Sequence, residues 1–430
     1  LEIRTARQAE VTQERMTSID RQLLREAGDT GQVLSHHRDP FTHGLRVGRL
    51  TELERLGLAT ARNDGAWSLR PDMEATLRQM GEREDIIKTL HRALKGRGLE
   101  GALPDSLIHD RLPGAASRII TGRLIERGLA DEYVDRHYLI VEGTDGHTHY
   151  ADVGQGGRVA PTATGAIVRL TPNIPDVRPA DLTIAKVAAQ NDGKYSLDAH
   201  LKSDPTARQA FAETHVRRLE AIRRLTGGVE RQADGSFLIG ADYPQKALDY
   251  EVRQASLSPM KVEVLDDRPL AETAKHPGMT WLDRELRADP EPVHAHARFG
   301  QEVRSALRTR MQWLMEEGLA TELPNGSMSL HDDYLPALHR RDMRAAADQV
   351  GRELRMPYSP AMSGEHIEGT LRRSVEIGTA KYAVVDRGRD FTLVPWRPVL
   401  EKHIDKSVSG QMRETGINWS IGRAKGPERD

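Results

Sequence analysis

The sequence predicts an α+β chain of several modules, in which winged-helix-like units alternate with small β-barrel-like modules. Three places in the sequence show an amphipathic helical pattern, then a short hairpin signal, then a second helical pattern. Two other stretches alternate apolar and polar residues and are punctuated by glycines, which is typical of strands joined by turns. A chain of 430 residues is long enough for two to four domains.

Each predicted hairpin begins at a glycine where the preceding helix would end, and it turns at an Asp-Gly or Asn-Gly pair. These pairs suit tight hairpins because they tolerate positive φ. The interval from the first glycine to the turn glycine is 8, 7 and 8 residues. The three hairpins occupy residues 57–69, 228–239 and 318–330.

The helices before the hairpins are predicted from apolar residues at helical spacing, such as Leu50, Leu53 and Leu56 in the first. A helical run also follows each hairpin, for instance over residues 72–80. Helix, hairpin and helix together form the last part of a winged-helix unit. A fourth, shorter copy is predicted over residues 123–140, again with a helix before its hairpin.

The β-rich stretches, residues 138–170 and 367–396, predict small curled sheets or barrels. Proline-rich connectors near Pro172 and Pro290 indicate module borders. The predicted modules are a winged-helix-like module, a small β module with a preceding helix, two further winged-helix-like modules and a C-terminal β-barrel-like module. They cover residues 1–100, 101–180, 181–258, 259–355 and 356–430.

Composition excludes several classes of protein. The net charge of −2 argues against a globally basic, histone-like binder but does not exclude local basic patches. Without cysteine there is no disulfide framework, thiolate zinc site or cysteine nucleophile. No stretch approaches the length of an apolar membrane span, and no N-terminal signal pattern is present, so we expect a cytoplasmic location. Because the chain begins at Leu1, we expect a fragment or a processed piece of a longer protein.

Several long runs of the sequence resemble the C-terminal region, catalogued as a domain of unknown function, of relaxases, the mobilisation nucleases of conjugative plasmids and integrative conjugative elements. The resemblance extends from about Thr12 to Arg423. The runs that carry it are residues 17–24, 48–59, 80–90, 128–143, 214–235, 280–286 and 391–400.

This resemblance implies a part in conjugative DNA processing. Relaxases nick one strand at the transfer origin and stay attached through a tyrosine, and their nuclease part precedes the region matched here. The first tyrosine of this chain is Tyr133, and no histidine–hydrophobic–histidine pair of the relaxase type accompanies it. We therefore predict no catalytic residue and no cofactor in this chain.

Arginines on the helices before the hairpins are the candidate DNA contacts. In a winged helix this helix can lie in the major groove while the hairpin touches the adjacent backbone. Arginine would then contact phosphates or guanine edges. Arg372, Arg373 and Arg423, with Trp396 and Trp419, are candidates for a C-terminal single-strand surface, although a packed strand exit is the favoured interpretation of residues 395–398. The candidate DNA-binding residues are Arg46, Arg49, Arg217, Arg218, Arg223, Arg224, Arg304, Arg308, Arg372, Arg373 and Arg423.

Two histidine pairs are candidate metal ligands. His147 and His149 share one face of a strand, and His294 and His296 are spaced in the same way. No third ligand is placed by spacing, so we interpret them as surface or turn histidines and predict no metal site. The slot two residues after each turn glycine holds Trp67, Phe237 or Met328, and we interpret it as packing of the hairpin onto its helix.

The favoured function is therefore non-catalytic: the chain would bind DNA near the transfer origin and dock the conjugative coupling protein or other transfer proteins, without inserting into a membrane. One alternative is a protein-interaction scaffold that does not touch DNA, which the near-neutral net charge fits. A second alternative is an independent metal-dependent nuclease that uses the histidine pairs.

Overall fold

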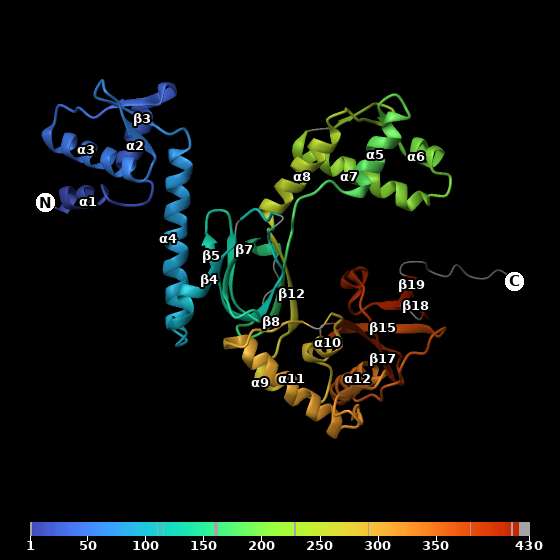
Figure 1. Cartoon of the computed structure of the whole chain (residues 1–430). Helices are drawn as coiled ribbons and strands as arrows, with labels where there is room; N and C mark the ends of the chain where they lie inside the picture. Colours follow the sequence, from blue (N-terminus) through green and yellow to red (C-terminus); the bar gives the residue numbers. More distant parts are fainter. Residues whose placement is uncertain are drawn as a thin grey trace. The chain divides into compact units, whose positions relative to one another are not determined.

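The structure is a computed structural model, and it describes residues 2–109, 111–114, 116–158, 162–227, 229–290, 292–378, 380–413 and 416–420. The chain divides into two compact units, Leu1–Pro104 and Asp105–Asp430. Figure 1 labels their elements. The two units are described separately.

The N-terminal unit packs helices against a three-stranded sheet of order β1-β3-β2. Asp39 begins α3 by accepting a hydrogen bond from the backbone N–H of Thr42, and Pro40 fits the first turn because no N–H is needed there. The elements are α1 (Glu2–Ala9), α2 (Ser18–Ala27), η1 (Gly28–Thr30), β1 (Gln32–Leu34), α3 (Pro40–Arg55), β2 (Ala59–Ala61), β3 (Ala66–Leu69) and α4 (Met73–Lys95).

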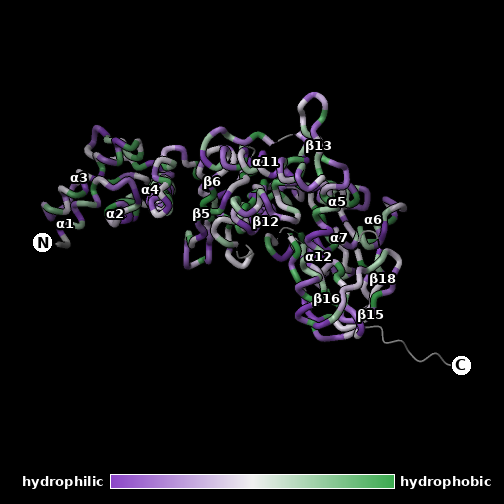
Figure 2. Tube along the Cα trace, turned by 90° about the horizontal axis from the view of Figure 1, so that it is seen from below, coloured by the Kyte–Doolittle hydropathy of each residue, from purple (hydrophilic) through white to green (hydrophobic). Residues whose placement is uncertain are grey.

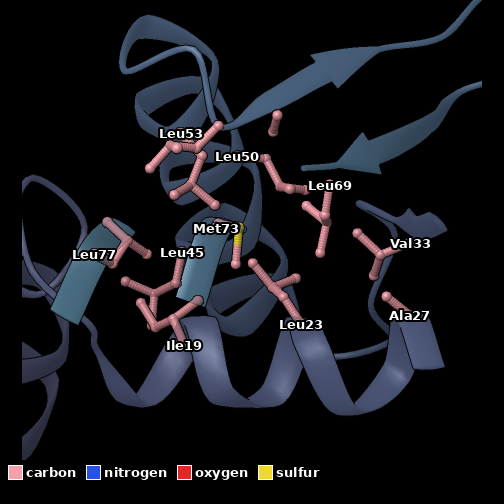
Figure 3. Close-up of a cluster of buried hydrophobic side chains, with 12 residues drawn as sticks. Ile19, Leu23, Ala27, Val33, Leu45, Leu50, Leu53, Leu69, Met73 and Leu77 are labelled. Carbon is pink, nitrogen blue, oxygen red and sulfur yellow. The ribbon is translucent and has the colours of Figure 1, made fainter. Parts of the chain in front are cut away.

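The core of this unit lies between α2, α3 and the first turns of α4, with β1 and β3 closing one side. Leu23, Leu50, Leu53, Met73 and Leu77 have no measurable exposure. Figure 3 shows these side chains converging from the three helices. Leucine at such spacing stabilises the helices by burying apolar surface, at about 25 cal/mol for each Å² removed from water.

The C-terminal unit contains a six-stranded sheet of order β12-β8-β5-β6-β7-β4. All of its neighbouring pairs are antiparallel except β4 with β7. A short helix, η2 (Glu100–Asp105), precedes it. The sheet strands, with the η3 turn (Gly156–Arg158), are β4 (Ser106–Ile108), β5 (Ile120–Asp131), β6 (Arg136–Gly143), β7 (Thr148–Gln155), β8 (Ile167–Pro172) and β12 (Met260–Asp266).

A helical segment is inserted between β8 and β12. The ends of the insertion are adjacent, because Pro172 of β8 lies opposite Met260 of β12. Figure 1 shows helices α5 to α8 reached through two connecting segments from these strands. The insertion has a three-stranded sheet of order β10-β11-β9. Its elements are α5 (Pro179–Ala189), β9 (Lys194–Tyr195), α6 (Leu197–Ser203), α7 (Gln209–Thr226), β10 (Glu230–Arg231), β11 (Phe237–Leu238) and α8 (Tyr243–Leu257).

After β12 the chain forms a further group of helices around a two-stranded hairpin. Trp281 and Phe299 are buried where α10 and α11 pack on the six-stranded sheet. The elements are α9 (Leu270–Thr273), α10 (Trp281–Arg287), α11 (Arg298–Glu316), β13 (Ala320–Glu322), β14 (Met328–Leu330) and α12 (Tyr334–Leu354).

The chain ends in a five-stranded antiparallel sheet of order β17-β16-β15-β18-β19. Its elements are β15 (His366–Ile377), β16 (Ala380–Asp386), β17 (Phe391–Pro395), η4 (Pro398–His403), β18 (Ser407–Arg413) and β19 (Gly416–Trp419). In the described residues neither large sheet pairs its first strand with its last, so both are open sheets. The predicted β-barrel-like modules are therefore wrong in this respect, while the α+β class is confirmed.

Two other predictions need correction. The helix expected before a fourth hairpin, within residues 123–140, is instead part of β5, which pairs directly with β6. The predicted module border at residues 258 and 259 separates β8 from β12, which are neighbours in one sheet. Strand pairing between distant segments leaves no local trace in the sequence, which is why the border was misplaced.

The three predicted helix–hairpin–helix segments are present, and we call them the first repeat (α2 to α4), the second repeat (α5 to α8) and the third repeat (α10 to α12). The central helices end at Gly57, Gly227 and Gly318, whose φ values of 72°, 65° and 70° favour glycine. The second stop is thus Gly227, whereas Gly228, predicted for that role, lies outside the described residues. With Gly227 the interval to the turn glycine is eight residues in every repeat.

Among the described residues, no helix is both long and apolar enough to cross a membrane. Figure 2 agrees with this, since hydrophilic and hydrophobic residues alternate over short distances along the labelled helices.

The core of the second repeat contains a buried imidazole, that of His215, which makes the stability of the repeat depend on pH. His200 and His215 are each 1% exposed, and their ring centroids lie 4.9 Å apart. Burial, and then the charge of His200, lower the pKa of His215 below its ordinary value of about 6.5. The unfolded chain therefore binds a proton more readily than the folded one, and stability is lost as the pH falls below about 6.5.

We expect the melting temperature of the purified chain to be lower at about pH 5.5 than at about pH 7.5. His215→Phe keeps an aromatic ring and should reduce this difference. His147→Gln is the control, because the His147 side chain is 45% exposed, and it should leave the difference unchanged. An unaltered pH dependence in His215→Phe would show that another group is responsible.

Candidate nucleic-acid interface

One arginine on the central helix of each repeat points into the repeat and pairs with an aspartate there. We call Arg49, Arg218 and Arg310 the strut arginines. In the first repeat Arg49 has no measurable exposure, and its Nε and Nη2 donate to the two carboxylate oxygens of Asp20 at 2.8 and 2.9 Å. Asp20 is the third residue of α2, where it also accepts from the backbone N–H of Thr17 at 2.8 Å. The pair therefore joins the start of one helix to the middle of the next.

The rest of the Arg49 guanidinium holds the segment that leads into α2. Its Nη1 donates to the carbonyls of Val11 at 2.9 Å and Gln13 at 2.6 Å, and its Nη2 donates to that of Arg15 at 3.0 Å. In the third repeat Arg310, also fully buried, pairs in the same way with Asp283. Buried guanidinium groups with this many partners stabilise the fold and are shielded from DNA.

Arg218 is the strut of the second repeat. Its Nε and Nη2 donate to Asp181 at 3.1 and 2.8 Å, and its side chain, 10% exposed, also lies beside Glu251. The hydroxyl of Tyr243 donates to the same Asp181 at 2.8 Å. Arg49 and Arg218 were predicted to contact DNA, but both guanidinium groups are enclosed by these internal partners.

Arg46 is likewise removed from the set of DNA contacts. It is 4% exposed, its guanidinium donates to both carboxylate oxygens of Glu26, and it donates to the carbonyl of Leu34 at 2.7 Å. The hydrogen bond from Arg46 is the largest of the effects that lower the pKa of Glu26. The sequence could not separate buried from exposed arginines on this helix because its apolar stripe is narrow and interrupted by glycines.

The remaining predicted arginines of the second repeat lie on the outside of α7. Arg217 and Arg224 are exposed. Arg223 and Arg224 share one carboxylate, that of Glu220, at 2.7 and 3.1 Å. The hydrogen bond from Arg223 is the main reason that the pKa of Glu220 falls to about 2. One carboxylate between two guanidinium groups leaves an excess of positive charge here.

Arg217 and Arg224 line the same hollow, together with Arg231 of the hairpin. We call this the α7 hollow; its volume is about 340 Å³. It is lined by Val216, Arg217, Glu220, Ala221, Arg224, Arg231 and Phe237. Three arginines face one glutamate, and within the described residues neither Arg217 nor Arg231 has an ion-pair partner. Guanidinium groups pair readily with carboxylate and phosphate oxygens, so this lining has the chemistry to accept an anion.

A second hollow on the other side of Arg217 has the opposite charge. It has a volume of about 510 Å³ and is lined by Asp198, Glu213 and Asp234 among others. The two hollows therefore differ in charge: acidic residues predominate in this one, and arginines predominate in the α7 hollow.

Neither of the other repeats carries all three of these cations at the corresponding positions. The three central helices can be aligned on the strut arginines, and the three hairpins on their turn glycines, Gly65, Gly235 and Gly326. In the first repeat Arg217, Arg224 and Arg231 correspond to Gly48, Arg55 and Ala61, and in the third repeat to Thr309, Glu316 and Glu322. Arg55 is held by Glu52 and Glu14. The arginine-lined hollow is thus particular to the second repeat.

The other candidate arginines are dispersed. On α11, Arg304 is half-buried and Arg308 is exposed, one helical turn apart, and neither has an ion-pair partner in the described part of the chain. Arg372 pairs with Asp386 at 2.7 Å, and Arg373 pairs with Glu353. Arg423 lies outside the described residues.

One histidine of each pair is buried, which differs from the prediction of surface or turn histidines, whereas His147 is 45% exposed and His296 is exposed. His149 is 3% exposed and lies between Asp145, at 3.0 Å, and His109, at 2.9 Å. Burial opposes ionisation of Asp145, but the hydrogen bond and charge of His149 outweigh it and lower the pKa of that carboxyl to about 2. His294 is also buried, 3.4 Å from Glu285. Within the described residues, no three histidine, aspartate or glutamate side chains are grouped to hold a metal ion.

Residues 46–428 match the protein family described as "Protein of unknown function (DUF3363)". The chain therefore belongs to this family. No curated protein and no solved structure matches the chain.

Proposed function

We propose that this chain is a non-catalytic, DNA-binding part of a conjugative relaxase, and that the α7 hollow of the second repeat is its principal phosphate contact. The observation that supports this is the convergence of Arg217, Arg224 and Arg231 on one hollow with a single carboxylate. Guanidinium groups in such an arrangement bind phosphate oxygens through paired N–H donors.

We further propose that the repeats are winged-helix units. In the first two, a strand lies between the first and central helices and pairs with the second strand of the hairpin, giving the orders β1-β3-β2 and β10-β11-β9. In a winged helix the helix before the hairpin can enter the major groove. Such docking would bring α7 and its hairpin to the phosphates on either side of the groove.

The link to conjugation is supported by the resemblance of the long runs quoted above to the C-terminal region of relaxases. In that setting the chain works in the cytoplasm, holds DNA near the transfer origin, and leaves strand cleavage to a nuclease part that precedes it. Other transfer proteins, such as the coupling protein, are its expected protein partners.

The test is the salt dependence of DNA binding. We expect the purified chain to bind a fluorescent duplex oligonucleotide at low ionic strength, with an affinity that falls as salt is added. The variant R217A/R224A/R231A should bind more weakly, and the slope of log K against log salt should fall by about 2 to 3. A single-stranded oligonucleotide of equal length establishes the strand preference.

The matched control is R62A/R70A/R78A, which removes the same charge from exposed arginines of the first repeat. It should keep the slope of the unmodified chain. No binding by the unmodified chain at low ionic strength would refute DNA binding. An equal loss in both triple variants would show that the contact is diffuse and not centred on the α7 hollow.

A further inference from the structure

The sheet of the third repeat is one strand shorter than the sheets of the other two. In the first two repeats the second hairpin strand lies in the middle, between the first hairpin strand and an additional strand, β1 or β9. In the third repeat β14 pairs with β13 alone. Among the described residues β14 therefore has no strand on the side that β1 and β9 occupy.

The additional strand has the same register in both complete repeats. Val33 of β1 lies opposite Trp67, and Tyr195 of β9 lies opposite Phe237. Just before the strand, the carbonyl of Gly31 accepts from the N–H of Leu69, and that of Gly193 accepts from the N–H of Ile239, each at 2.8 Å. An apolar residue thus covers the slot that Met328 occupies in the third repeat.

In the first two repeats the additional strand lies between the first and the central helix. In the third repeat the equivalent segment contacts the six-stranded sheet instead. Between α10 and α11, the N–H of Ala295 donates to the carbonyl of Thr144 at 2.8 Å, in the turn between β6 and β7. A Cβ on Gly300 would lie 2.5 Å from the same carbonyl, which shows how closely this segment approaches the turn. Glu291 of the connection lies outside the described residues. Ala295 thus ties the connection to the six-stranded sheet.

Exposure follows from the missing strand. Met328 is 48% exposed, whereas Phe237, at the equivalent position, is 1% exposed. Figure 2 shows the loop near the label β13 projecting beyond the neighbouring tube. Because successive N–H groups of a strand point to opposite sides, those of Met328 and Leu330 face the open edge, as those of Trp67 and Leu69 face β1.

We propose that the open edge of β14 binds an extended segment of a protein partner, which adds to the hairpin as an antiparallel third strand. The segment would place a large apolar residue opposite Met328, as Val33 and Tyr195 do in the other repeats. Glu322 lies on the far side of β14 from the open edge, opposite Met328, and is exposed, with no ion-pair partner among the described residues, so a lysine or arginine of the segment on the same face would be attracted to it across β14. Main-chain hydrogen bonds supply affinity in this mode, and the apolar contact sets the register.

This binding mode can be tested by disulfide trapping in the full chain, which contains no cysteine of its own. The probe is a synthetic peptide that copies residues 190–198, with cysteine in place of Tyr195. Under a glutathione redox buffer, the M328C variant should form a mixed disulfide with the peptide about tenfold faster than either control, because pairing in register raises the local thiol concentration.

The controls are S329C, whose side chain points to the opposite face of the hairpin, and N325C in the exposed turn. Equal trapping in all three variants, or no trapping in M328C, would overturn the proposal. Preferential formation of M328C homodimers over the mixed disulfide would replace the partner segment by a second copy of this chain, and would also overturn it. None of these outcomes depends on whether the α7 hollow binds DNA.

Discussion

Replacing Arg49 by methionine will destabilise the N-terminal unit by about 3 to 5 kcal/mol, the range for a buried ion pair that loses one partner. The substitution leaves Asp20, which has no measurable exposure, without its counterion. It also removes the donors for the carbonyls of Val11, Gln13 and Arg15. Unfolding in urea, followed by circular dichroism, measures the change as a lower midpoint with an unchanged slope.

The control is Arg55→Met on the same helix. The Arg55 side chain is 58% exposed in its ion pairs with Glu14 and Glu52, so its loss should cost less than about 1 kcal/mol. If Arg49→Met and Arg55→Met shifted the midpoint equally, Arg49 would not be a strut. The double variant D20N/R49M should not recover full stability, because the three carbonyls would still lack donors.

Gly154→Ala should be similarly damaging in the C-terminal unit. Gly154 has a φ of 81°, where a Cβ costs about 1 to 2 kcal/mol. That Cβ would also lie 2.1 Å from the carbonyl oxygen of Leu257, at the end of α8, so backbone would have to move, at about 1 to 3 kcal/mol more. We expect the alanine variant to lower the melting temperature of the full chain and to loosen the junction between β7 and α8.

Gly157→Ala is the matched control, three residues further along the chain. A Cβ at Gly157 would meet nothing within 4 Å, and its φ is not in the left-handed region. This variant should melt within a degree or two of the unmodified chain, the scale of a surface substitution. A large effect of Gly157→Ala, or none of Gly154→Ala, would contradict the close approach of Leu257 to Gly154.

The helix–hairpin–helix order could be predicted from the sequence because it rests on local chemistry. Leucines at helical spacing, a glycine in the left-handed region after the helix, and an Asp-Gly or Asn-Gly turn each act within a few residues. The shift from Gly228 to Gly227 shows the limit of that reasoning, since two adjacent glycines offer equally good helix ends.

The strand partners and the buried arginines could not be predicted in this way. β8 pairs with β12 across an inserted repeat, and no local pattern records that pairing. The arginines of α3 and α7 look alike in the sequence, yet Arg49 and Arg218 point inward to an aspartate while Arg217 and Arg224 point outward. The useful signal was the third helical residue, Asp20, Asp181 or Asp283, because a capping aspartate there can also receive an arginine from the next helix.

The placement of the second repeat between two neighbouring strands has a consequence for biosynthesis. As the polypeptide leaves the ribosome, β8 emerges before its neighbour β12, and the whole of α5 to α8 separates them. The intervening helices can acquire their own core during that interval, whereas the sheet must wait for residues translated later. The order of translation therefore allows the second repeat to fold before the six-stranded sheet is complete.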